Sequence, residues 1–509
     1  MESIKLKNFR CLEDTGEIQI KPLTFLVGSN SSGKSSFLNF FPLLKQSIGE
    51  RRIGPFLWNG ENIDLKDFKN VVRHGEDLLE VEFTLKNISV TRNIRLPQRN
   101  SEAIHDIRVC FSVCESENQF DAIKTVTIEA DGFVYSYGKD INSAIKLAIK
   151  DSNSNCLKSD DLSDTIGLAS NNSLLPGLFF IKDKKSVDDI SENCIDRIRK
   201  LLKQQKVEKA SDNLDISRAV MMLGYHLVDP KEKLAKYLES FFHCQFDDET
   251  LSELHLLNHY RYINVIIDSI NVALLRLVKR MIYVGPLREA TERYYRYMNL
   301  DIDEINPDGS NLAMFLHNLD QTDKARLNYW LERYLGFTIS TQSDMGHVEI
   351  LITERDKTQQ NLVDVGFGYT QVLPILVNIW KSLYIDTTMY GDFENPNKIY
   401  QEHILAIEQP ELHLHPRFQA KFAELLVSVV KAAKEEKKDI RFVIETHSEI
   451  LLNKIGELIA TGQLHQDDTN VVIFNALHEK LNKYVELATY SKDGYLQNWP
   501  IGFFSEDVD

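Results

Sequence analysis

The 509-residue sequence lacks the marks of secreted and membrane proteins. Its six cysteines are scattered, with one CxxxC and no CxxC pair: Cys11, Cys110, Cys114, Cys156, Cys194 and Cys244. This spacing indicates reduced cytosolic thiols and disfavours a disulfide framework or a zinc site. No run of about 18 apolar residues is present, and the N-terminal MESIKLKNFR has no apolar signal core. We therefore expect a cytoplasmic protein without a membrane partner.

The sequence also has no excess of basic residues, and its formal net charge is −16. This balance argues against a general nucleic-acid coat but leaves a local basic groove open, so nucleic acid stays open as a partner. The sequence is 43% hydrophobic and 26% charged, as in ordinary globular proteins. Its length allows two or three domains, or one large elaborated domain.

Periodic segments divide the chain into strand-rich and helical stretches. The segments SIKLKNF, GEIQI and LTFLVG read as three strands, followed by a Gly/Ser loop and a helix over about 35–48 that Pro42 should kink. Residues 79–138 are again strand-like, and about 185–280 are helical. From residue 281 onward strands and helices alternate, as in a mostly parallel sheet. The pattern predicts one α/β core interrupted by a helical insert.

The stretch GSNSSGKS matches GxxxxGK[ST] between a buried strand and a helix, which is the context that a P-loop requires. Glycines allow the backbone to curl so that its N–H groups face phosphate oxygens. Lys34 is expected to reach the β- and γ-phosphates, and the Ser35 hydroxyl to ligate Mg²⁺. The predicted nucleotide-binding residues of this loop are Gly28, Ser29, Asn30, Ser31, Ser32, Gly33, Lys34, Ser35 and Ser36.

The segment HILAIEQPELHLHP is the candidate Walker B partner of the P-loop. Four apolar residues form a buried strand that ends at Glu408, whose carboxylate can hold Mg²⁺ through water. The next position, where a second carboxylate often activates water, is Gln409. His413 and His415 could form a metal pair, but no third ligand is evident, so a role in shaping this loop at a subunit contact is favoured.

Two further segments place polar residues beside predicted strands or helices. In RFVIETHSEIL, His447 follows a buried strand, at the position where α/β sheets bind their ligands. We interpret it as a γ-phosphate sensor; a capping or core histidine is the alternative.

In VDVGFGYTQVLPIL, Gly366 and Gly368 precede a helix for which Thr370 is the expected N-cap. A second anion-binding helix start is useful if it completes another subunit's site; a plain turn is the alternative.

The order of these motifs resembles the ABC-type ATPase heads of the SMC and DNA-repair class. It is most similar to the bacterial branch near the overcoming-lysogenization-defect (OLD) ATPases and the ATPase subunits of anti-phage systems such as Septu and PARIS. The segments KNFRC, YVGPLREATERYYR and NWPIGFFSED also resemble that branch. The resemblance covers about 1–75 and 281–509 and leaves the middle of the chain without a recognised motif.

The resemblance implies a head-to-tail ATP sandwich that forms a homodimer or a higher even-numbered oligomer. One subunit would bind ATP and Mg²⁺ through Lys34, Ser35 and Glu408, with His447 sensing the γ-phosphate. The signature residues of the other subunit would approach that phosphate: Gly366, Gly368, Thr370 and Gln371. Many relatives have Ser where Thr370 stands, which keeps the hydroxyl.

The implied fold is an α/β ABC-type ATPase head with a mostly parallel sheet and an antiparallel β subdomain, interrupted by a helical insert. We expect residues 1–175 to form the N-terminal half with the P-loop and the β subdomain. Residues 176–280 would form the insert. Residues 281–509 would form the C-terminal half with the signature, Walker B and switch histidine.

Two departures from the OLD pattern affect the expected function. Relatives tend to have Glu-Glu-Pro-Glu where this chain has Gln409, and a glutamine orients water but cannot take its proton; we expect slow hydrolysis, with Glu411 able to assist. OLD proteins carry a C-terminal TOPRIM nuclease, and residues 450–509 are too few for one. HQDD at 465–468 reads as a loop, so an effector nuclease or toxin is expected on a separate chain.

We therefore expect an ATPase that dimerises on ATP and controls an effector in phage defence. An SMC-like DNA-repair or clamp motor is the first alternative, although the insert is too short for a long coiled coil. An ATP-locked scaffold with negligible turnover is the second. Arg288 and Arg293 could face phosphates or DNA, with a solvated helix equally favoured. KQQKVEK at 203–209 reads as a solvated helix face, with a partner or DNA surface as the alternative.

Overall fold

The computed structural model describes most of the chain. The described residues are 1–90, 103–115, 121–139, 145–151, 156–157, 166–169, 173–183, 186–204, 213–223, 231–286, 292–298, 302–354, 358–385, 401–475 and 484–499. They form a mixed α/β structure, as the sequence predicts. None of the helices in these ranges is both long and apolar enough to cross a membrane.

The chain divides into two compact units. The first comprises Met1–Lys5, Ser47–Leu57 and Gly75–Arg276, and the second comprises Leu6–Gln46, Trp58–His74 and Leu277–Asp509. The boundaries that the sequence favours, at residues 176 and 281, stay predictions. The P-loop, the Walker B strand and the signature segment all fall in the second unit, so the candidate site is built within one body.

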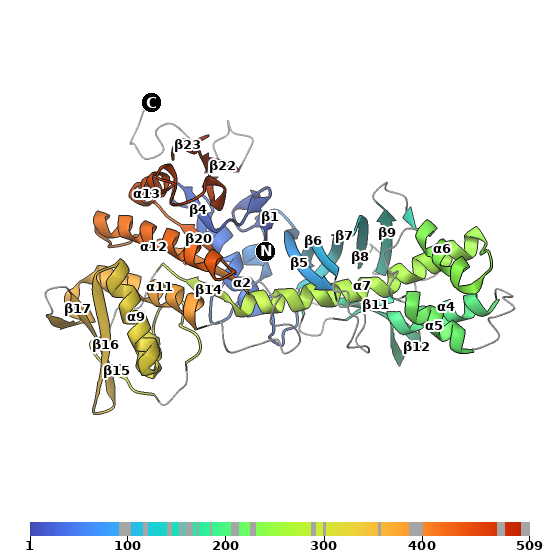
Figure 1. Ribbon diagram of the computed structural model, residues 1–509, viewed down its shortest axis with the longest axis horizontal. Coiled ribbons are helices and arrows are strands. Elements are labelled where there is room, and N and C mark those ends of the chain that lie inside the picture. Colours follow the sequence, from blue (N-terminus) through green and yellow to red (C-terminus); the bar gives the residue numbers. More distant parts are fainter. Residues whose placement is uncertain are drawn as a thin grey trace. The chain divides into compact units, whose positions relative to one another are not determined.

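The first unit combines an antiparallel meander with a helical part (Figure 1). Its strands are β5 (Leu78–Val90), β6 (Ala103–Glu115), β7 (Asp121–Ala130), β8 (Phe133–Lys139), β9 (Ile145–Asp151) and β10 (Cys156–Leu157), and a separate sheet of β11 (Ile166–Ala169), β12 (Gly177–Asp183) and β13 (Ser186–Asp189). Its helices are α4 (Ile190–Gln204), α5 (Asn213–Leu223), α6 (Lys231–Phe242) and α7 (Asp248–Lys279), the last of which continues beyond the unit at Arg276.

Buried polar contacts explain why strands and helices of this first unit belong together. The Tyr135 hydroxyl on β8 lies 2.9 Å from Nδ1 of His259 on α7, and the Tyr262 hydroxyl donates to Asp131 at 2.7 Å. Asn264 of α7 exchanges two hydrogen bonds with the backbone of Leu178. The predicted β subdomain and the predicted insert therefore share one core.

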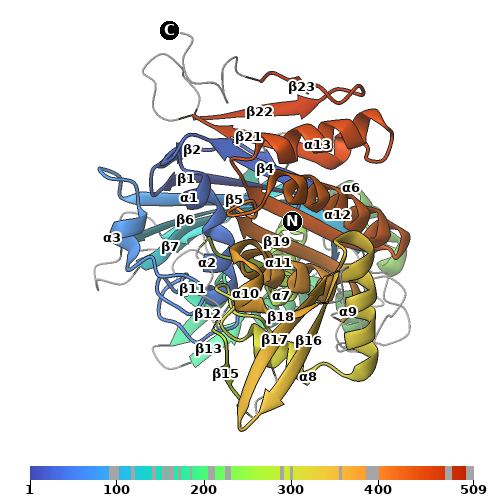
Figure 2. The ribbon, with the colours of Figure 1, turned by 90° about the vertical axis from the view of Figure 1, so that its left-hand side faces the viewer.

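The second unit contains the remaining elements (Figure 2). Its strands are β1 (Ser3–Phe9, which begins in the first unit), β2 (Leu12–Asp14), β3 (Ile18–Gln19), β4 (Leu23–Gly28), β14 (Met281–Val284), β15 (Tyr295–Arg296), β16 (Phe337–Asp344), β17 (His347–Glu354), β18 (Gln359–Asn361), β19 (Gln401–Glu408), β20 (Lys438–Glu445), β21 (Thr469–Phe474), β22 (Val485–Tyr490) and β23 (Leu496–Gln497). Its helices are α1 (Lys34–Leu38), α2 (Phe40–Ser47), α3 (Phe68–Val71), α8 (Leu312–Asn318), α9 (Gln321–Tyr334), α10 (Leu362–Val365), α11 (Phe367–Tyr384), α12 (Pro416–Glu435), α13 (Glu449–Ala460) and the 3₁₀ turn η2 (Gln466–Asp468).

The central sheet of the second unit has the strand order β14-β19-β20-β4-β21-β22-β23. The first five of these strands pair in parallel, and β22 and β23 are antiparallel. The P-loop strand β4 therefore lies beside β20, while the Walker B strand β19 lies one strand further away. Because parallel strands end at the same edge, the ends of β4, β19 and β20 come together.

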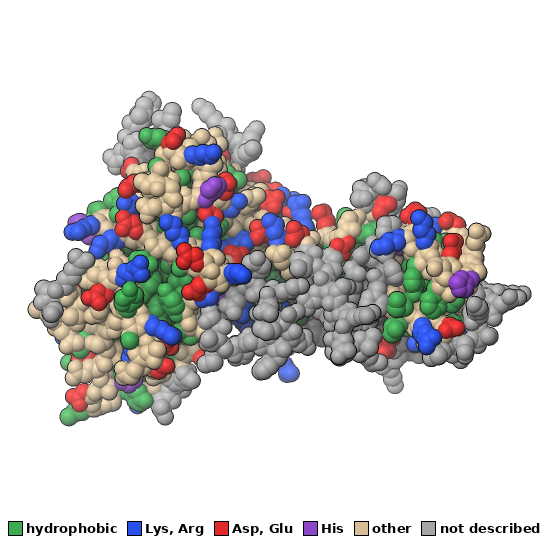
Figure 3. Space-filling view, in the orientation of Figure 1, with side chains coloured by type: hydrophobic (Ala, Val, Ile, Leu, Met, Phe, Trp, Pro, Cys, Tyr) green, Lys and Arg blue, Asp and Glu red, His purple; other side chains and the backbone are tan. Residues whose placement is uncertain are grey.

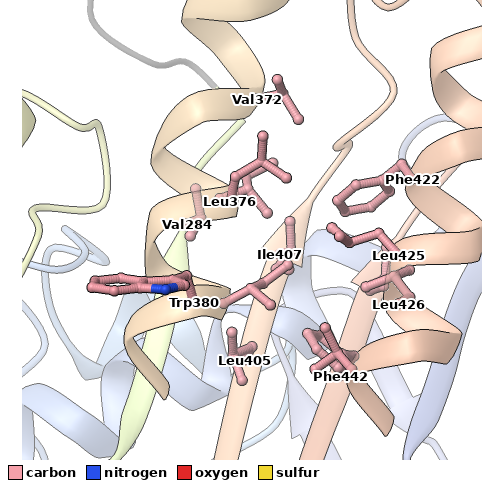
Figure 4. Packing of buried hydrophobic residues seen from close by; sticks show 14 of the residues in the cluster. Val284, Val372, Leu376, Trp380, Leu405, Ile407, Phe422, Leu425, Leu426 and Phe442 are labelled. Atoms are coloured by element: carbon pink, nitrogen blue, oxygen red, sulfur yellow. The ribbon is translucent and has the colours of Figure 1, made fainter. Parts of the chain in front are cut away.

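Apolar side chains cover the sheet and fix the helices on it. In Figure 4, Val372, Leu376 and Trp380 of α11 pack toward side chains from β14, β19 and β20. Apolar side chains of α12 join the same cluster. Alternate residues of β19 point to this cluster, as with Leu405 and Ile407. Each fully buried side chain of this size stabilises the unit by about 1.5–3 kcal/mol.

The predicted helix after the P-loop is broken into α1 and α2 at Asn39. Pro42 has no N–H, so the carbonyl of Leu38 loses its partner in the next turn, and the proline ring also crowds that carbonyl. The chain resumes with a hydrogen bond of 3.2 Å from the Leu43 N–H to the Asn39 carbonyl. The kink expected at Pro42 is therefore confirmed.

Candidate functional site: a P-loop facing two acidic strand ends

The P-loop follows β4 and depends on two glycines. Gly28 and Gly33 have φ values of 149° and 106°. A Cβ at Gly28 would lie 2.3 Å from the Phe474 carbonyl oxygen, and one at Gly33 would lie 2.5 Å from Leu12 Cδ2. Side chains would clash at both positions, so glycine is required for the loop to curl between strand and helix.

Lys34 lies under this loop with 3% of its surface exposed. Its Nζ donates to the carbonyl oxygens of Gly28 at 3.0 Å and Ser29 at 2.8 Å. Burial lowers the pKa of Lys34, while the negative charges of Glu445 and Glu411 act in the opposite direction. The ammonium is thus held in the loop at the position from which a P-loop lysine binds phosphate.

Glu445, at the end of β20, is a site residue that the sequence analysis did not single out. Its Oε1 accepts a hydrogen bond of 3.0 Å from the Ser35 hydroxyl and lies 4.0 Å from Lys34 Nζ. Burial raises the pKa of Glu445, against the effects of Ser35 and Lys34. The available signal was an acid that ends a buried strand, the same signal that identified Glu408.

Glu408, at the end of β19, is opposite Glu445 in the strand register. Its Oε1 accepts a hydrogen bond of 2.7 Å from the hydroxyl of Tyr283 on β14. Tyr283 lies at the start of YVGPLREATERYYR, and the sequence alone indicates no role for it. The buried phenol fixes the carboxylate at the sheet edge.

The loop after β19 brings Gln409 and Glu411 to the same edge as His447, which follows β20. Gln409 has φ 41°, a left-handed conformation, and its N–H donates to the Glu445 carbonyl at 2.9 Å. Glu411 Oε1 accepts a 2.6 Å bond from the His447 N–H. Burial raises the pKa of Glu411. Partial burial and then the charge of Lys34 lower the pKa of His447. A neutral imidazole at neutral pH can donate one hydrogen bond to phosphate.

His415 has a structural role as the N-cap of α12, where its Nδ1 accepts from the Arg417 N–H at 3.2 Å. His413 is exposed, with φ 62°. Within the described ranges no group of three or more His, Cys, Asp or Glu side chains is arranged to hold a metal. The capping bond gives His415 a role in shaping this loop, the reading that the sequence favoured over a metal pair.

The signature segment forms the start of α11, but its cap differs from the prediction. The helix begins at Phe367 with Gly366 as N-cap, so the expected N-cap Thr370 lies inside the first turn and the prediction is wrong. The reason is the φ of 116° at Gly366, which ends α10 and lets α11 start earlier. Thr370 and Gln371 are buried, whereas Gly366 is exposed.

Gly368 connects this helix start to the Walker B loop of the same chain. A Cβ on Gly368 would lie 3.1 Å from the His413 carbonyl oxygen and 3.3 Å from Leu414 Cδ2. Apart from Gly366 itself and its neighbours along the chain, no described residue places an atom within 4 Å of a Cβ built on Gly366. Of the two signature glycines, Gly366 is therefore the one with open space beside it.

Several candidates lie elsewhere or outside the described ranges. Arg293 forms a two-bond ion pair with Asp364 of α10, at 2.9 and 2.5 Å. Arg288, most of KQQKVEK and the end of NWPIGFFSED are outside the described residues. HQDD forms the η2 turn and its flank, as expected for a loop. On the face seen in Figure 3, basic and acidic side chains are interspersed over the described surface.

Oxygen donors predominate at the edge of the sheet, which is the chemistry that Mg²⁺ prefers. The Ser35 hydroxyl and the carboxylates of Glu408 and Glu445 come from neighbouring parts of one unit. One carboxylate oxygen, Glu445 Oε2, is buried without a hydrogen-bond partner among the described residues. The donor set therefore fits a hard divalent cation bound together with a phosphate.

Comparisons with solved structures give only distant similarity. The Smc head domain with an extended coiled coil bound to the C-terminal domain of ScpA, from Pyrococcus furiosus, is 11% identical, with 96% of each chain covered and a TM-score of 0.32. The SMC head domain from Thermotoga maritima is 11% identical over 96% of this chain and 98% of that chain, with a TM-score of 0.32. The Smc head domain with a coiled coil and joint from Pyrococcus yayanosii is 11% identical over 97% of each chain, with a TM-score of 0.33. No curated protein matches the chain.

The comparison with family models is more decisive. The model of the AAA ATPase domain matches residues 1–452, which include the P-loop, the signature segment, the Walker B strand and the end of β20. This match spans most of the 509 residues. The chain therefore belongs to the AAA ATPase domain family.

Proposed function

We propose that this chain binds ATP with Mg²⁺ at the P-loop and hydrolyses it slowly. The observation that carries the proposal is the contact of Ser35 and Lys34 with Glu445, with Glu408 opposite in the register of the next strand. A lysine and a hydroxyl that follow a glycine loop suit phosphate and its cation. Two carboxylates at the same edge of the sheet can bind Mg²⁺ directly or through its water ligands.

Each side chain has a distinct part in the proposed reaction. Lys34 binds the β- and γ-phosphates, and Ser35 and Glu408 hold the divalent cation. The cation, when bound, neutralises charge that develops on the phosphate oxygens. His447 donates a hydrogen bond to the γ-phosphate. Gln409 orients the attacking water without taking its proton, which slows hydrolysis.

Two copies are proposed to close around ATP in a head-to-tail manner. The support is Gly366, an exposed glycine with open space beside it that starts the 18-residue helix α11. Such a helix start favours an anion. Burial of Thr370 and Gln371 makes the backbone at Gly366, rather than these side chains, the proposed contact with the partner's γ-phosphate.

The closed dimer is proposed to control a separate effector, a nuclease or toxin, in phage defence. This part rests on the similarity of KNFRC and NWPIGFFSED to the OLD-related branch. It implies that the chain itself does not cut nucleic acid. Purified protein with Mg²⁺ or Mn²⁺ and ATP should leave DNA and RNA intact; cleavage lost on mutating acids of this chain would contradict it.

The proposed ATP site is tested by Lys34→Ala. ATP binding and hydrolysis should be lost, because this change removes the ammonium that the carbonyls of Gly28 and Ser29 hold in the loop. Lys69→Ala, a lysine on α3 of the same unit, is the matched control and should keep both. The measurements are ATP affinity and single-turnover hydrolysis. ATP affinity unchanged in Lys34→Ala would refute the proposal, and binding without turnover in the parent would leave an ATP-locked scaffold.

A further inference from the structure

Glu445 is a buried acid whose two carboxylate oxygens differ in their hydrogen bonding. Its side chain is 3% exposed. Oε1 accepts the Ser35 hydrogen bond, but Oε2 has no hydrogen-bond partner within the described part of the chain. A buried carboxylate is costly unless charges or hydrogen bonds offset its desolvation. An unsatisfied buried oxygen therefore indicates a further positive or hydrogen-bonding group at this position.

The Ser35 hydrogen bond has a direction that matters for a cation. A hydroxyl has one proton and two lone pairs. The proton of Ser35 goes to Glu445 Oε1, so both lone pairs stay available to a metal ion. Carboxylates that accept a hydrogen bond from a metal ligand fix its orientation and strengthen it as a donor. Glu445 stands in that relation to Ser35.

The order of the strands favours Glu445 over Glu408 as the acid beside the P-loop. β20, which ends at Glu445, pairs directly with β4, whereas β19 is separated from β4 by β20. Neighbouring strands lie about 5 Å apart, so the backbone at Glu408 is one such spacing further from the loop. Oε1 of Glu408 is also engaged by the Tyr283 hydroxyl.

We propose that Glu445 is the positioning carboxylate of the cation site: it orients the Ser35 hydroxyl and offers Oε2 to the bound cation or its water. This inference rests on the proposed ATP–Mg²⁺ binding and adds a residue to it. Glu408 then supplies the second acid, across the register. Side chains at the ends of two adjacent strands thereby hold the cation of ATP, and the end of β20 is the nearer of the two to the P-loop.

The test is the dependence of ATP affinity on Mg²⁺, with Mn²⁺ affinity measured by electron paramagnetic resonance in the presence of ATP. Glu445→Gln keeps the shape and an acceptor for Ser35 but removes the charge. We expect its Mn²⁺ affinity to fall about 10–100-fold, as for other residues that support a metal ligand. Its metal-free ATP affinity should be retained or increased, because a negative charge near the phosphates is gone. That retained affinity also shows that the variant is folded.

Companion variants separate a role through Ser35 from a general effect. The double variant Ser35→Ala/Glu445→Gln should lose less Mn²⁺ affinity than the sum of the two single losses, since part of the effect of Glu445 passes through that hydroxyl. Glu445→Asp keeps the charge and should lose less than Glu445→Gln. Glu457→Gln, on the exposed part of α13, is the matched control and should behave as the parent.

The outcomes distinguish this inference from the proposed function. A parent that binds ATP with a Mg²⁺-dependent gain, together with Glu445→Gln that keeps the whole gain, overturns the role of Glu445 and leaves the ATP site in place. Fully additive losses in the double variant overturn the route through Ser35. A parent that binds no ATP with or without Mg²⁺ refutes the proposed function itself.

Discussion

The hydroxyl of Tyr283 donates a 2.7 Å hydrogen bond to Oε1 of Glu408, which joins the ends of two neighbouring parallel strands. In the register, Tyr283 is opposite Ala406, so the long phenol reaches two residues along β19. Both residues are buried. The Walker B acid is thus fixed by a residue more than a hundred positions away in the sequence.

Tyr283→Phe should both destabilise the protein and slow hydrolysis. Removing a buried hydrogen bond to a charged group costs about 1.5–3 kcal/mol. Glu408 also loses the contact that orients it toward the site, so turnover should fall more than ATP affinity. Denaturant unfolding and single-turnover hydrolysis measure the two effects. Tyr329→Phe, an exposed tyrosine of α9, is the control; equal turnover in both variants would show that Tyr283 does not position Glu408.

Gln409 should control how long ATP stays bound. The parent is expected to turn over below about 1 per second, under the usual enzyme range. Gln409→Glu places a base at this position and should speed hydrolysis and shorten the closed dimer. Gln409→Ala cannot orient water and should slow hydrolysis and lengthen the closed state. Both keep a non-glycine residue at φ 41°, so backbone strain is similar in the set.

Single-turnover rates and dimer lifetimes of the three proteins decide this point. If Gln409→Ala hydrolyses as fast as the parent, Gln409 is not the group that positions water. Glu411 is then the better candidate, because it lies on the same loop and already accepts from the His447 N–H.

Hybrid dimers should reveal whether the signature acts on the partner's ATP. Lys34→Ala chains mixed with Gly366→Asp chains form hybrids in which one site has neither defect. About a quarter of the parental rate is expected, since half of randomly formed dimers are hybrids and each keeps one of two sites. Gly366 suits the experiment better than Gly368, whose added side chain would press on the His413 carbonyl of its own chain.

Gly366→Ala is the matched control for this mixture. It imposes the same strain at φ 116° but adds no charge, so it should lose less activity than Gly366→Asp. ATPase rate is measured in mixtures whose hybrid content is verified. A mixture as inactive as either parent variant would mean that each chain uses its own signature or that both sites must act together.

His403, in the middle of β19, should make the protein sensitive to mild acid. Burial, and then the charges of Arg280, Lys438 and Lys381, lower its pKa to about 3 from 6.5. Between these values the unfolded chain binds a proton that the folded chain excludes. The free energy of unfolding should therefore fall as pH drops below 6.5, by up to about 1.4 kcal/mol per pH unit.

His403→Leu removes this titrating group and should flatten the dependence. Neither ring nitrogen of His403 has a hydrogen-bond partner within the described ranges, so a leucine leaves no acceptor or donor unpaired there. Denaturant unfolding from neutral pH to about pH 5 measures the slope. His74→Leu, at an exposed histidine, should keep the slope of the parent; an equally steep slope in His403→Leu would assign it to other groups.

The P-loop, the strand ends and the kink at Pro42 could be predicted from the sequence because each is a local property. GSNSSGKS is contiguous, a glycine's need for positive φ concerns its own backbone, and a missing N–H acts within one helical turn. The apolar runs that end at Glu408 and Glu445 likewise predict buried parallel strands. The N-cap at Thr370 was predicted wrongly, because Gly366 can adopt a backbone conformation that starts the helix earlier.

Only the tertiary structure decided which of these ends meet. The sequence contains two strands that finish in an acid, and nothing in either says that β20, rather than β19, pairs with β4. The order of strands in a parallel sheet is set by long-range packing, in which α11 and α12 bury their apolar faces on the sheet. That packing brings Glu445 to Ser35, 410 residues away in the chain, and Tyr283 to Glu408.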